Sequence, residues 1–279
     1  MIFKKKFLNK TVVITGHTGF KGSWLSIWLK TLGANVIGIS DNIPTNPSNF
    51  EASKIFNLIQ DHRVDITNSE KINELIKKYA PDYIFNLAAQ SLVRKSYEEP
   101  IQTFLTNAIG TANVLDAAKK LSKKVNCIMI TSDKVYRNFE FKRGYHENDM
   151  LGGVDPYSAS KGMAEIAIYS YVQTLMNDKN TNVRIAIGRA GNVIGGGDWA
   201  TDRIVPDSIN AWSKKRKVIL RNAKSTRPWQ HVLEPLSGYL LLGALLDDNL
   251  NLNGEAFNFG PPDKNDFSVL SLIEKMSNY

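Results

Sequence analysis

The sequence predicts an α/β fold, built on a doubly wound parallel sheet with a smaller C-terminal lobe. Strand-like and helix-like segments alternate over residues 11–188 with the lengths expected of such a sheet. Glycines 16, 19 and 22 stand between the first strand-like run and the first amphipathic run. After residue 188 the alternation becomes irregular and glycine-rich, which favours a separate small lobe.

The elements of the first part follow one another as strand and crossover helix. Residues 11–15 form a short run of β-branched residues, which is typical of a buried strand. Trp24, Leu25 and Trp28 then recur at a helical spacing. The same reasoning predicts a strand at 35–40, another that ends at 62–65, and three more at 82–88, 125–131 and 182–188. It also predicts helices at 71–79, 100–121 and 156–176.

The second part is predicted from weaker patterns. We expect a loop over 190–202, a helix near 204–214, a strand at 217–220, a helix over about 232–247 and a strand at 256–260. The chain stops inside the amphipathic pattern 267–279. These patterns divide the chain into a dinucleotide-binding domain, 1–188, and a mainly substrate-binding lobe, 189–279, which we expect to be truncated at its C-terminus.

The glycine turn indicates the first ligand. Gly16, Gly19 and Gly22 permit a tight turn, close approach of a ligand to the backbone, and close packing of helix on strand. The helix N-terminus offers unpaired N–H groups to a pyrophosphate. The spacing therefore favours a Rossmann-type dinucleotide site over an ordinary glycine-rich turn.

Residues just after each strand lie where such sheets bind ligands. Asp41, after the second strand, suits the ribose diol of NAD and would repel the extra phosphate of NADP, although it could be a surface turn residue. Asp65 and Ile66 could meet the adenine, or Asp65 could cap a helix. Leu87, Ala88 and Ala89 leave room for a cofactor against the backbone.

Two groups of residues suggest catalysis. Ser132, Asp133 and Lys134 place a hydroxyl, a carboxylate and an ammonium after the fifth strand, although they also suit a turn. Tyr157 and Lys161 are four residues apart, on one face of a predicted helix. A nearby ammonium favours the phenolate, so this pair could take a proton from an alcohol as hydride leaves its carbon.

These residues resemble the extended short-chain dehydrogenase/reductase family. Thr15–Gly22 carries its TGxxGxxG motif, in which Thr18 and Phe20 are also implied to bind the cofactor, and Tyr157 and Lys161 form its YxxxK motif. Within the family, several stretches are similar to the dehydratases that act on CDP-glucose: "NLAAQSLVRKSYEEP", "TSDKVY", "GYHENDMLGGVDPYSASKG", "GNVIGGGDW" and "RPWQHVLEPLSGYL". The resemblance implies a hydro-lyase with tightly held NAD, bound also by Asn107, that converts CDP-glucose to CDP-4-keto-6-deoxyglucose.

The resemblance also implies roles for individual residues. Tyr157 would be the base on the O4 hydroxyl, with Lys161 tuning it and holding the nicotinamide ribose. Ser132 would hydrogen-bond O4, and Asp133 would protonate the departing C6 hydroxyl, which requires a raised pKa. Lys134 departs from the glutamate of the dTDP-glucose enzymes. It could remove the C5 proton or only hold a neighbour in place.

Substrate contacts are implied in the second part of the chain. Asn192 and Arg227 stand where relatives contact the diphosphate, and the arginine fork suits phosphate. Arg203, His231 and Arg94 are further candidates. Residue spacing does not distinguish cytidine from other bases.

Other functions remain compatible with parts of the pattern. A sugar-nucleotide 4-epimerase, or a dehydratase for another nucleotide sugar, needs the same Tyr–Lys pair, but Asp133 favours dehydration. A non-catalytic NAD-binding regulatory protein usually lacks the tyrosine or the lysine. The four histidines are dispersed, so no metal site is expected.

Composition restricts the partners. The net charge of +8 on 279 residues is scattered, which favours anionic small molecules over nucleic acid. The single cysteine, Cys127, cannot form an internal disulfide. Neither a signal peptide nor a membrane span is recognisable, so we expect a cytoplasmic protein. By resemblance we expect a homodimer paired through helices 100–121 and 157–176.

Overall fold

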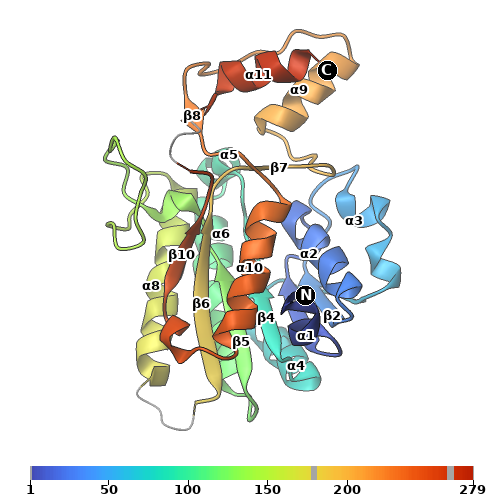
Figure 1. Ribbon diagram of the computed structural model, residues 1–279, viewed down its shortest axis with the longest axis vertical. Helices are drawn as coiled ribbons and strands as arrows, with labels where there is room; N and C mark the ends of the chain where they lie inside the picture. Colours follow the sequence, from blue (N-terminus) through green and yellow to red (C-terminus); the bar gives the residue numbers. More distant parts are fainter. Residues whose placement is uncertain (1, 177–180, 263–266, 279) are drawn as a thin grey trace.

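The computed structural model describes residues 2–176, 181–262 and 267–278. Its centre is a seven-stranded sheet in the order β10-β6-β5-β4-β1-β2-β3, in which every neighbouring pair is parallel (Figure 1). The strands are β1 Thr11–Thr15, β2 Asn35–Ser40, β3 Gln60–Arg63, β4 Tyr83–Asn86, β5 Val125–Ile130, β6 Val183–Ala190 and β10 Ala256–Phe259. The predicted doubly wound parallel sheet is confirmed.

Helices cover both faces of the sheet. On one face lie α1 (Ile2–Phe7), α2 (Phe20–Thr31) and α10 (Leu233–Leu246), and on the other α4 (Ser69–Tyr79), α7 (Gly110–Lys119) and α8 (Pro156–Met176). Successive strand residues alternate between the two cores: Val12 and Ile14 face the first, and Val13 faces the second. Because both faces are buried, the central strands β1, β4 and β5 are largely apolar, as the sequence indicated, whereas the edge strand β3 is polar and mostly exposed.

The predicted helix over 100–121 is interrupted. Residues Pro100–Phe104 (α6) are α-helical, Leu105–Ile109 (η2) form a π-helical turn, and Gly110–Lys119 (α7) return to α-helix. The extra residue in the wide turn lets Asn107 reach the loop that follows β4. A periodicity argument sees one helix here because the π-turn shifts the register by only one residue.

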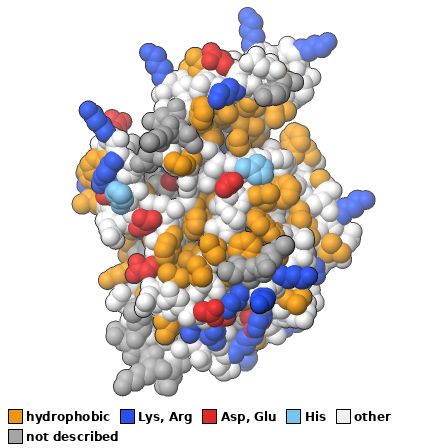
Figure 2. All heavy atoms as spheres, in the orientation of Figure 1, with side chains coloured by type: hydrophobic (Ala, Val, Ile, Leu, Met, Phe, Trp, Pro, Cys, Tyr) orange, Lys and Arg blue, Asp and Glu red, His pale blue; other side chains and the backbone are white. Residues whose placement is uncertain are grey.

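The C-terminal part divides between the sheet and an upper lobe. Strand β10 and helix α10 extend the sheet and its cover, whereas α9 (Ile204–Ser213), α11 (Val269–Ser277) and the pair β8 (Thr226–Arg227) and β11 (Phe267–Ser268) form the lobe above it (Figure 1). Hydrophobic side chains gather where the lobe meets the body (Figure 2). The division of the chain at residue 188 stays a prediction.

One predicted strand is wrong. Residues 217–220 adopt no regular secondary structure and pair with no strand in the described part of the chain. Ile219 is 88% exposed, so the β-branched run that suggested a strand has no neighbour to bury it.

Several short elements were not predicted. They are α1, α3 (Asn49–Ala52), η1 (Ile55–Asn57), α5 (Val93–Glu98), η3 (Asp133–Val135), η4 (Leu250–Leu252), the parallel pair β7 (Val193–Ile194) and β9 (Gln230–His231), and the antiparallel pair β8 and β11. Among the residues described, no helix is both long and apolar enough to cross a membrane.

Candidate active site

The glycine turn forms a cradle at the carboxyl end of β1. Gly16 has φ +71°, and a Cβ there would lie 2.8 Å from the backbone of Ala88. A Cβ at Gly22 would lie 2.1 Å from the carbonyl oxygen of Gly16. Helix α2 begins at Phe20 with Gly19 as its N-cap, and no side chain caps its first N–H groups. The turn therefore presents open backbone donors to an anion, as predicted for a pyrophosphate.

Substitution of Gly22 by Ala tests this cradle. We expect the free energy of unfolding to fall by about 1–3 kcal/mol, because the new methyl group must displace backbone. NAD binding should weaken as the turn opens. Thermal unfolding and a cofactor titration would measure both effects. Gly196→Ala is the matched control, since a Cβ there meets nothing within 4 Å. Equal thermal stability and equal NAD affinity of the two variants would contradict the role of Gly22 in the cofactor turn.

The edge of the sheet beyond β2 and β3 carries the predicted ribose and adenine residues. Asp41 is exposed and its carboxylate accepts hydrogen bonds only from Asn42 among the described residues, at 2.8 and 2.9 Å. Thr18 is buried and bonds Ser40 and the carbonyl of Asn42. Asp65 accepts the N–H of Thr67 at 2.8 Å in the turn before α4, whose N-cap is Asn68, so the capping alternative for Asp65 is wrong. Its contact with adenine, like that of buried Ile66, stays a prediction.

The loop after β4 runs beside the glycine turn. Leu87, Ala88 and Ala89 are half-buried, and the N–H of Ala88 donates to Thr15 Oγ1 at 3.1 Å. Asn107 is fully buried: it accepts the N–H of Gln90 and donates to the Gln90 carbonyl and to Ser160 Oγ. Its amide is thus occupied by the protein, so Asn107 fixes the loop. A direct contact with the cofactor stays a prediction.

Helix α8 carries the Tyr–Lys pair into this edge. Asp155 caps its first turn, since it accepts the N–H of Ser158 at 2.9 Å. The backbone N–H of Tyr157 donates to Ser96 Oγ of α5 at 3.1 Å. Both side chains of the pair are buried, and Lys161 Nζ lies 3.4 Å from the carbonyl oxygen of Ile130 at the end of β5. Burial lowers the pKa of Lys161 to about 8.

A buried ion pair lies one turn beyond Lys161 on α8. Glu165 binds the guanidinium of Arg189 through both carboxylate oxygens and accepts a hydrogen bond from Thr131 at 2.5 Å. Arg189 also donates to Tyr136 and to the carbonyl of Glu147. This network ties β5, β6 and α8 together beneath the site, so Arg189 is structural.

Ser132, Asp133 and Lys134 follow β5 and face the start of α8. Ser132 Oγ donates to Asp133 Oδ1 at 3.0 Å and accepts the N–H of Lys134 at 3.2 Å. Lys134 Nζ lies 5.6 Å from the ring centroid of Tyr157. Burial raises the pKa of Asp133 and outweighs the opposing effects of Lys134, of Ser132 and of Lys21. This is the direction that an acid requires.

The phenol of Tyr157 differs from expectation. Burial raises its pKa, with Asp133 adding to the effect, while a hydrogen bond from Ser132 and the charge of Arg203 oppose it. Lys161 was expected to lower this pKa, but desolvation of the buried phenolate dominates in the ligand-free protein. Tyr157 therefore keeps its proton at neutral pH in this state.

The structure adds two residues that the sequence analysis did not single out. Lys21, inside the glycine motif, lies with its Nζ 5.9 Å from the ring centroid of Tyr239 of α10. Burial, with the charges of Arg203 and Lys161, lowers the pKa of Lys21 to about 8, although Asp133 opposes this. The Tyr239 hydroxyl is buried without a hydrogen-bond partner among the described residues. The sequence offered one signal for this: Lys21 is a charged residue at a variable position of the glycine motif.

The predicted substrate residues are only partly brought together. Arg203 is close enough to Tyr157 and Arg227 to Asp133 for each arginine to lower the pKa of its neighbour. Arg203 also binds Asp198 at 3.0 Å. The other three are Asn192, half-buried before β7; His231, exposed in β9; and Arg94, exposed and bound with Arg221 to Asp202.

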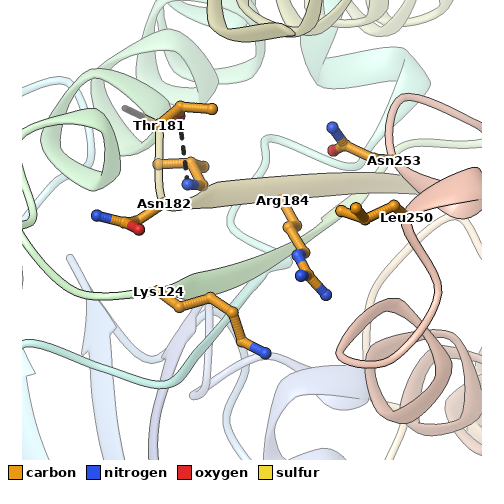
Figure 3. A pocket seen from close by; sticks show the side chains of 7 residues that line it. Lys124, Thr181, Asn182, Arg184, Leu250 and Asn253 are labelled. Carbon is orange, nitrogen blue, oxygen red and sulfur yellow. Dashed lines mark hydrogen bonds between the residues drawn. The ribbon is translucent and has the colours of Figure 1, made fainter. Parts of the chain in front are cut away.

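A cavity of about 250 Å³ lies at the opposite edge of the sheet, where β5 and β6 begin (Figure 3). Its two cations are already engaged: Lys124 binds Asp247 at 2.7 Å, and Arg184 donates to the carbonyls of Leu246 and Asp247 at the end of α10. The candidate catalytic residues follow the carboxyl ends of the strands, so this cavity is not part of the candidate site. Across the described ranges, no three His, Cys, Asp or Glu residues gather as metal ligands.

Comparisons with known proteins agree with this geometry. The family described as GDP-mannose 4,6 dehydratase matches residues 13–275. A CDP-glucose 4,6-dehydratase of Salmonella typhimurium is 46% identical over 99% of this chain and 78% of its own. A UDP-glucose 4-epimerase of Mycoplasma genitalium is 25% identical over 89% of this chain and 76% of its own. A dTDP-glucose 4,6-dehydratase of Bacillus anthracis, solved with NAD, shares the fold with TM-score 0.80 at 22% identity, over 96% of this chain and 80% of its own.

Proposed function

Because the chain belongs to the GDP-mannose 4,6 dehydratase family, we propose that it catalyses the NAD-dependent dehydration of CDP-glucose to CDP-4-keto-6-deoxyglucose. The observation that carries the proposal is the meeting of Tyr157, Ser132 and Asp133 beside the glycine cradle. The choice of CDP-glucose rests on the 46% identity to a relative of that name.

The cradle fits NAD. Gly16 and Gly22 leave space that a Cβ would fill, and the uncapped start of α2 suits a pyrophosphate. Asp41 would accept hydrogen bonds from a ribose diol, and Lys161 would hold the second ribose. When bound, NAD supplies a hydride acceptor for C4 of the sugar and a hydride donor for C6.

The protein's side chains would manage the protons. Tyr157, in its ionised form, receives the proton of the O4 hydroxyl, which Ser132 orients. The resulting ketone acidifies the C5 proton. Asp133, whose pKa burial raises, then protonates the C6 hydroxyl so that it leaves as water. Lys134, near the ring of Tyr157, is the group we favour for removing the C5 proton and returning it.

The charges around the site suit the diphosphate of the substrate. Arg203 is close enough to Tyr157, and Arg227 to Asp133, to lower the pKa of each, and Asn192 lies just before β7. We propose that these residues hold the diphosphate and that exposed His231 and Arg94 act at its rim.

A panel of nucleotide sugars tests the proposal. Purified protein with NAD is incubated with CDP-, UDP-, dTDP- and GDP-sugars, and the 4-keto product is detected by its absorbance in base. We expect product from CDP-glucose in large excess over the others. A UDP-sugar product that retains its C6 hydroxyl would support a 4-epimerase instead.

An apolar stripe supports the proposed homodimer. Tyr97, Ile101 and Ile109 lie on the outer side of α5, α6 and η2, and Ile166 and Tyr169 on the adjoining side of α8. Ile101 and Ile166 are 69% and 63% exposed. Such a patch on two adjacent helices is typical of an isologous interface, in which the same helices of a second copy cover it.

The double substitution Ile101→Arg and Ile166→Arg should convert the dimer to a monomer. Four buried arginines per dimer would be desolvated without partners. Light scattering coupled to size exclusion measures the mass. Ile219→Arg, on an exposed residue of the upper lobe, should leave the mass unchanged. A wild-type monomer, or a dimeric double variant, would refute this interface.

A further inference from the structure

We propose that a buried ion pair, Glu165 with Arg189, is a positioning device for the candidate acid. It fastens both ends of the turn 132–134 to helix α8, and so holds Asp133 at a fixed place relative to Tyr157. The inference rests on the proposed function and deepens it. The pair does not touch the substrate. It acts through the acid and the phenol, whose relative placement decides whether water loss at C6 follows oxidation at C4.

The first end of the turn is tied directly to α8. Thr131 immediately precedes Ser132, and its hydroxyl donates to Glu165 Oε1 at 2.5 Å. The side chains of Thr131 and Glu165 are both buried. By contrast, Lys161 Nζ of the same helix lies 3.4 Å from the carbonyl oxygen of Ile130. Because hydrogen bonds weaken as they lengthen, the carboxylate of Glu165 is the stronger of these two ties.

The second end of the turn is tied to the same carboxylate through the guanidinium. Tyr136 lies two residues beyond Lys134. Its hydroxyl accepts a hydrogen bond from Arg189 Nη1 at 2.7 Å and donates to Asn258 Oδ1 at 2.7 Å. The guanidinium carbon also lies 5.0 Å from the centroid of the Tyr136 ring. Since Arg189 binds both carboxylate oxygens of Glu165, the two ends of the turn meet at one side chain of α8.

The hydrogen bonds inside the turn have a different effect. Ser132 Oγ donates to Asp133 Oδ1 at 3.0 Å and accepts the N–H of Lys134 at 3.2 Å. These two contacts hold the internal shape of the turn, but they do not join it to α8, the helix that carries Tyr157. The residues that flank the turn supply that connection.

Stability alone is a poor explanation for a charged pair in this place. The side chains of Arg189 and Glu165 are only 5% and 2% exposed. Desolvation of two buried charges offsets much of their attraction, so apolar residues of similar size would often stabilise the fold equally well. Hydrogen bonds differ from apolar contacts because they define direction as well as distance. The pair is therefore better explained by the placement of its neighbours.

The charge of Glu165 also reaches the Tyr–Lys pair. Glu165 lies one turn beyond Lys161, and its carboxylate raises the pKa of that ammonium, which burial lowers more strongly. A substitution of Glu165 would therefore change the charge of Lys161 together with the position of the turn. The sharper test leaves both charges in place and removes only the hydroxyl groups that bind them.

Thr131→Val deletes the hydroxyl that binds Glu165, and Tyr136→Phe deletes the hydroxyl that binds Arg189. NAD affinity and the KM for CDP-glucose should stay within about twofold of wild type, since neither substitution alters the cradle or the proposed diphosphate residues. Turnover should fall about tenfold in each variant and about a hundredfold in the double variant, because small displacements of a reacting group cost rate on this scale. Circular dichroism and thermal unfolding check that each variant folds.

The slowed step separates positioning from mere support. Tyr157 and Lys161 keep their places on α8, so oxidation at C4 should continue, whereas a displaced Asp133 should delay water loss at C6. Reduced cofactor should therefore accumulate during turnover in both variants, and stopped-flow absorbance in the near ultraviolet would show it. Thr131→Ser keeps a hydroxyl and should restore turnover and remove the accumulation.

The outcomes distinguish this inference from the proposed function. If folded Thr131→Val and Tyr136→Phe convert CDP-glucose at the wild-type rate, or lose rate without a build-up of reduced cofactor, the positioning role is overturned. A loss of rate in Thr131→Ser equal to that in Thr131→Val would also overturn it. A wild type that makes no 4-keto product from CDP-glucose refutes the function on which the inference rests.

Discussion

Replacement of Tyr157 by Phe should lower turnover of CDP-glucose by about 10²–10⁴-fold. The change removes only the hydroxyl that we propose to accept the O4 proton, and the buried ring keeps its place beside Lys134. Because the substitution leaves the glycine cradle and Lys161 unchanged, NAD should bind as in the wild type. Initial rates of 4-keto product formation and a separate cofactor titration would measure the two effects.

Tyr171→Phe is the matched control for this variant. It makes the same chemical change on the same helix, but on a side chain that packs against the hydrophobic core between α8 and the sheet. Its turnover should stay within about twofold of wild type. Wild-type turnover in Tyr157→Phe would remove the basis of the proposed chemistry.

Replacement of Asp133 by Asn should abolish dehydration while leaving some oxidation at C4. The amide keeps the size of the carboxyl but cannot protonate the C6 hydroxyl. CDP-glucose oxidised at C4 should therefore accumulate, most at alkaline pH, and the near-ultraviolet absorbance of the reduced cofactor should rise with it. Stopped-flow absorbance and product analysis would follow the two steps.

The control for this variant is Asp116→Asn on α7. The carboxylate of Asp116 forms a surface ion pair with Lys120, and such pairs contribute little to stability. This control variant should behave as the wild type. If Asp133→Asn still released 4-keto-6-deoxy product at a wild-type rate, another group would have to be the acid.

Most of the sheet could be predicted because its central strands are buried on both faces. Val12, Val13 and Ile14, for example, fill cores on opposite sides, so the whole run must be apolar. Helix α8 was predicted at its observed bounds because Pro156 fits its first turn and Asp155 caps it. Both signals are local in sequence.

Elements that depend on tertiary partners were missed. The apolar run at 217–220 has local strand propensity but no neighbouring strand. Helix α1 is stabilised by the fit of Phe7 against Tyr83 and Phe85, residues far away in sequence. The π-turn exists because Asn107 bonds the loop after β4. No periodicity within a segment encodes these contacts.

The site divides in the same way. Motif spacing located Gly16, Gly22, Tyr157 and Lys161, because their geometry follows from one turn and one helix face. The contribution of Lys21 and Tyr239 comes from α2 and α10 packing side by side beneath the site. The raised pKa of Tyr157 depends on its burial, which spacing does not reveal.

The most direct measurement follows deuterium through the reaction. CDP-glucose labelled with deuterium at C4 is converted by the holoenzyme, and the product is read by NMR. The account predicts a 4-keto-6-deoxy sugar that carries the deuterium at C6, since the same active site takes the hydride and returns it. A product with deuterium at C4 and an intact C6 hydroxyl, or one whose C6 hydrogen comes from solvent, would contradict it.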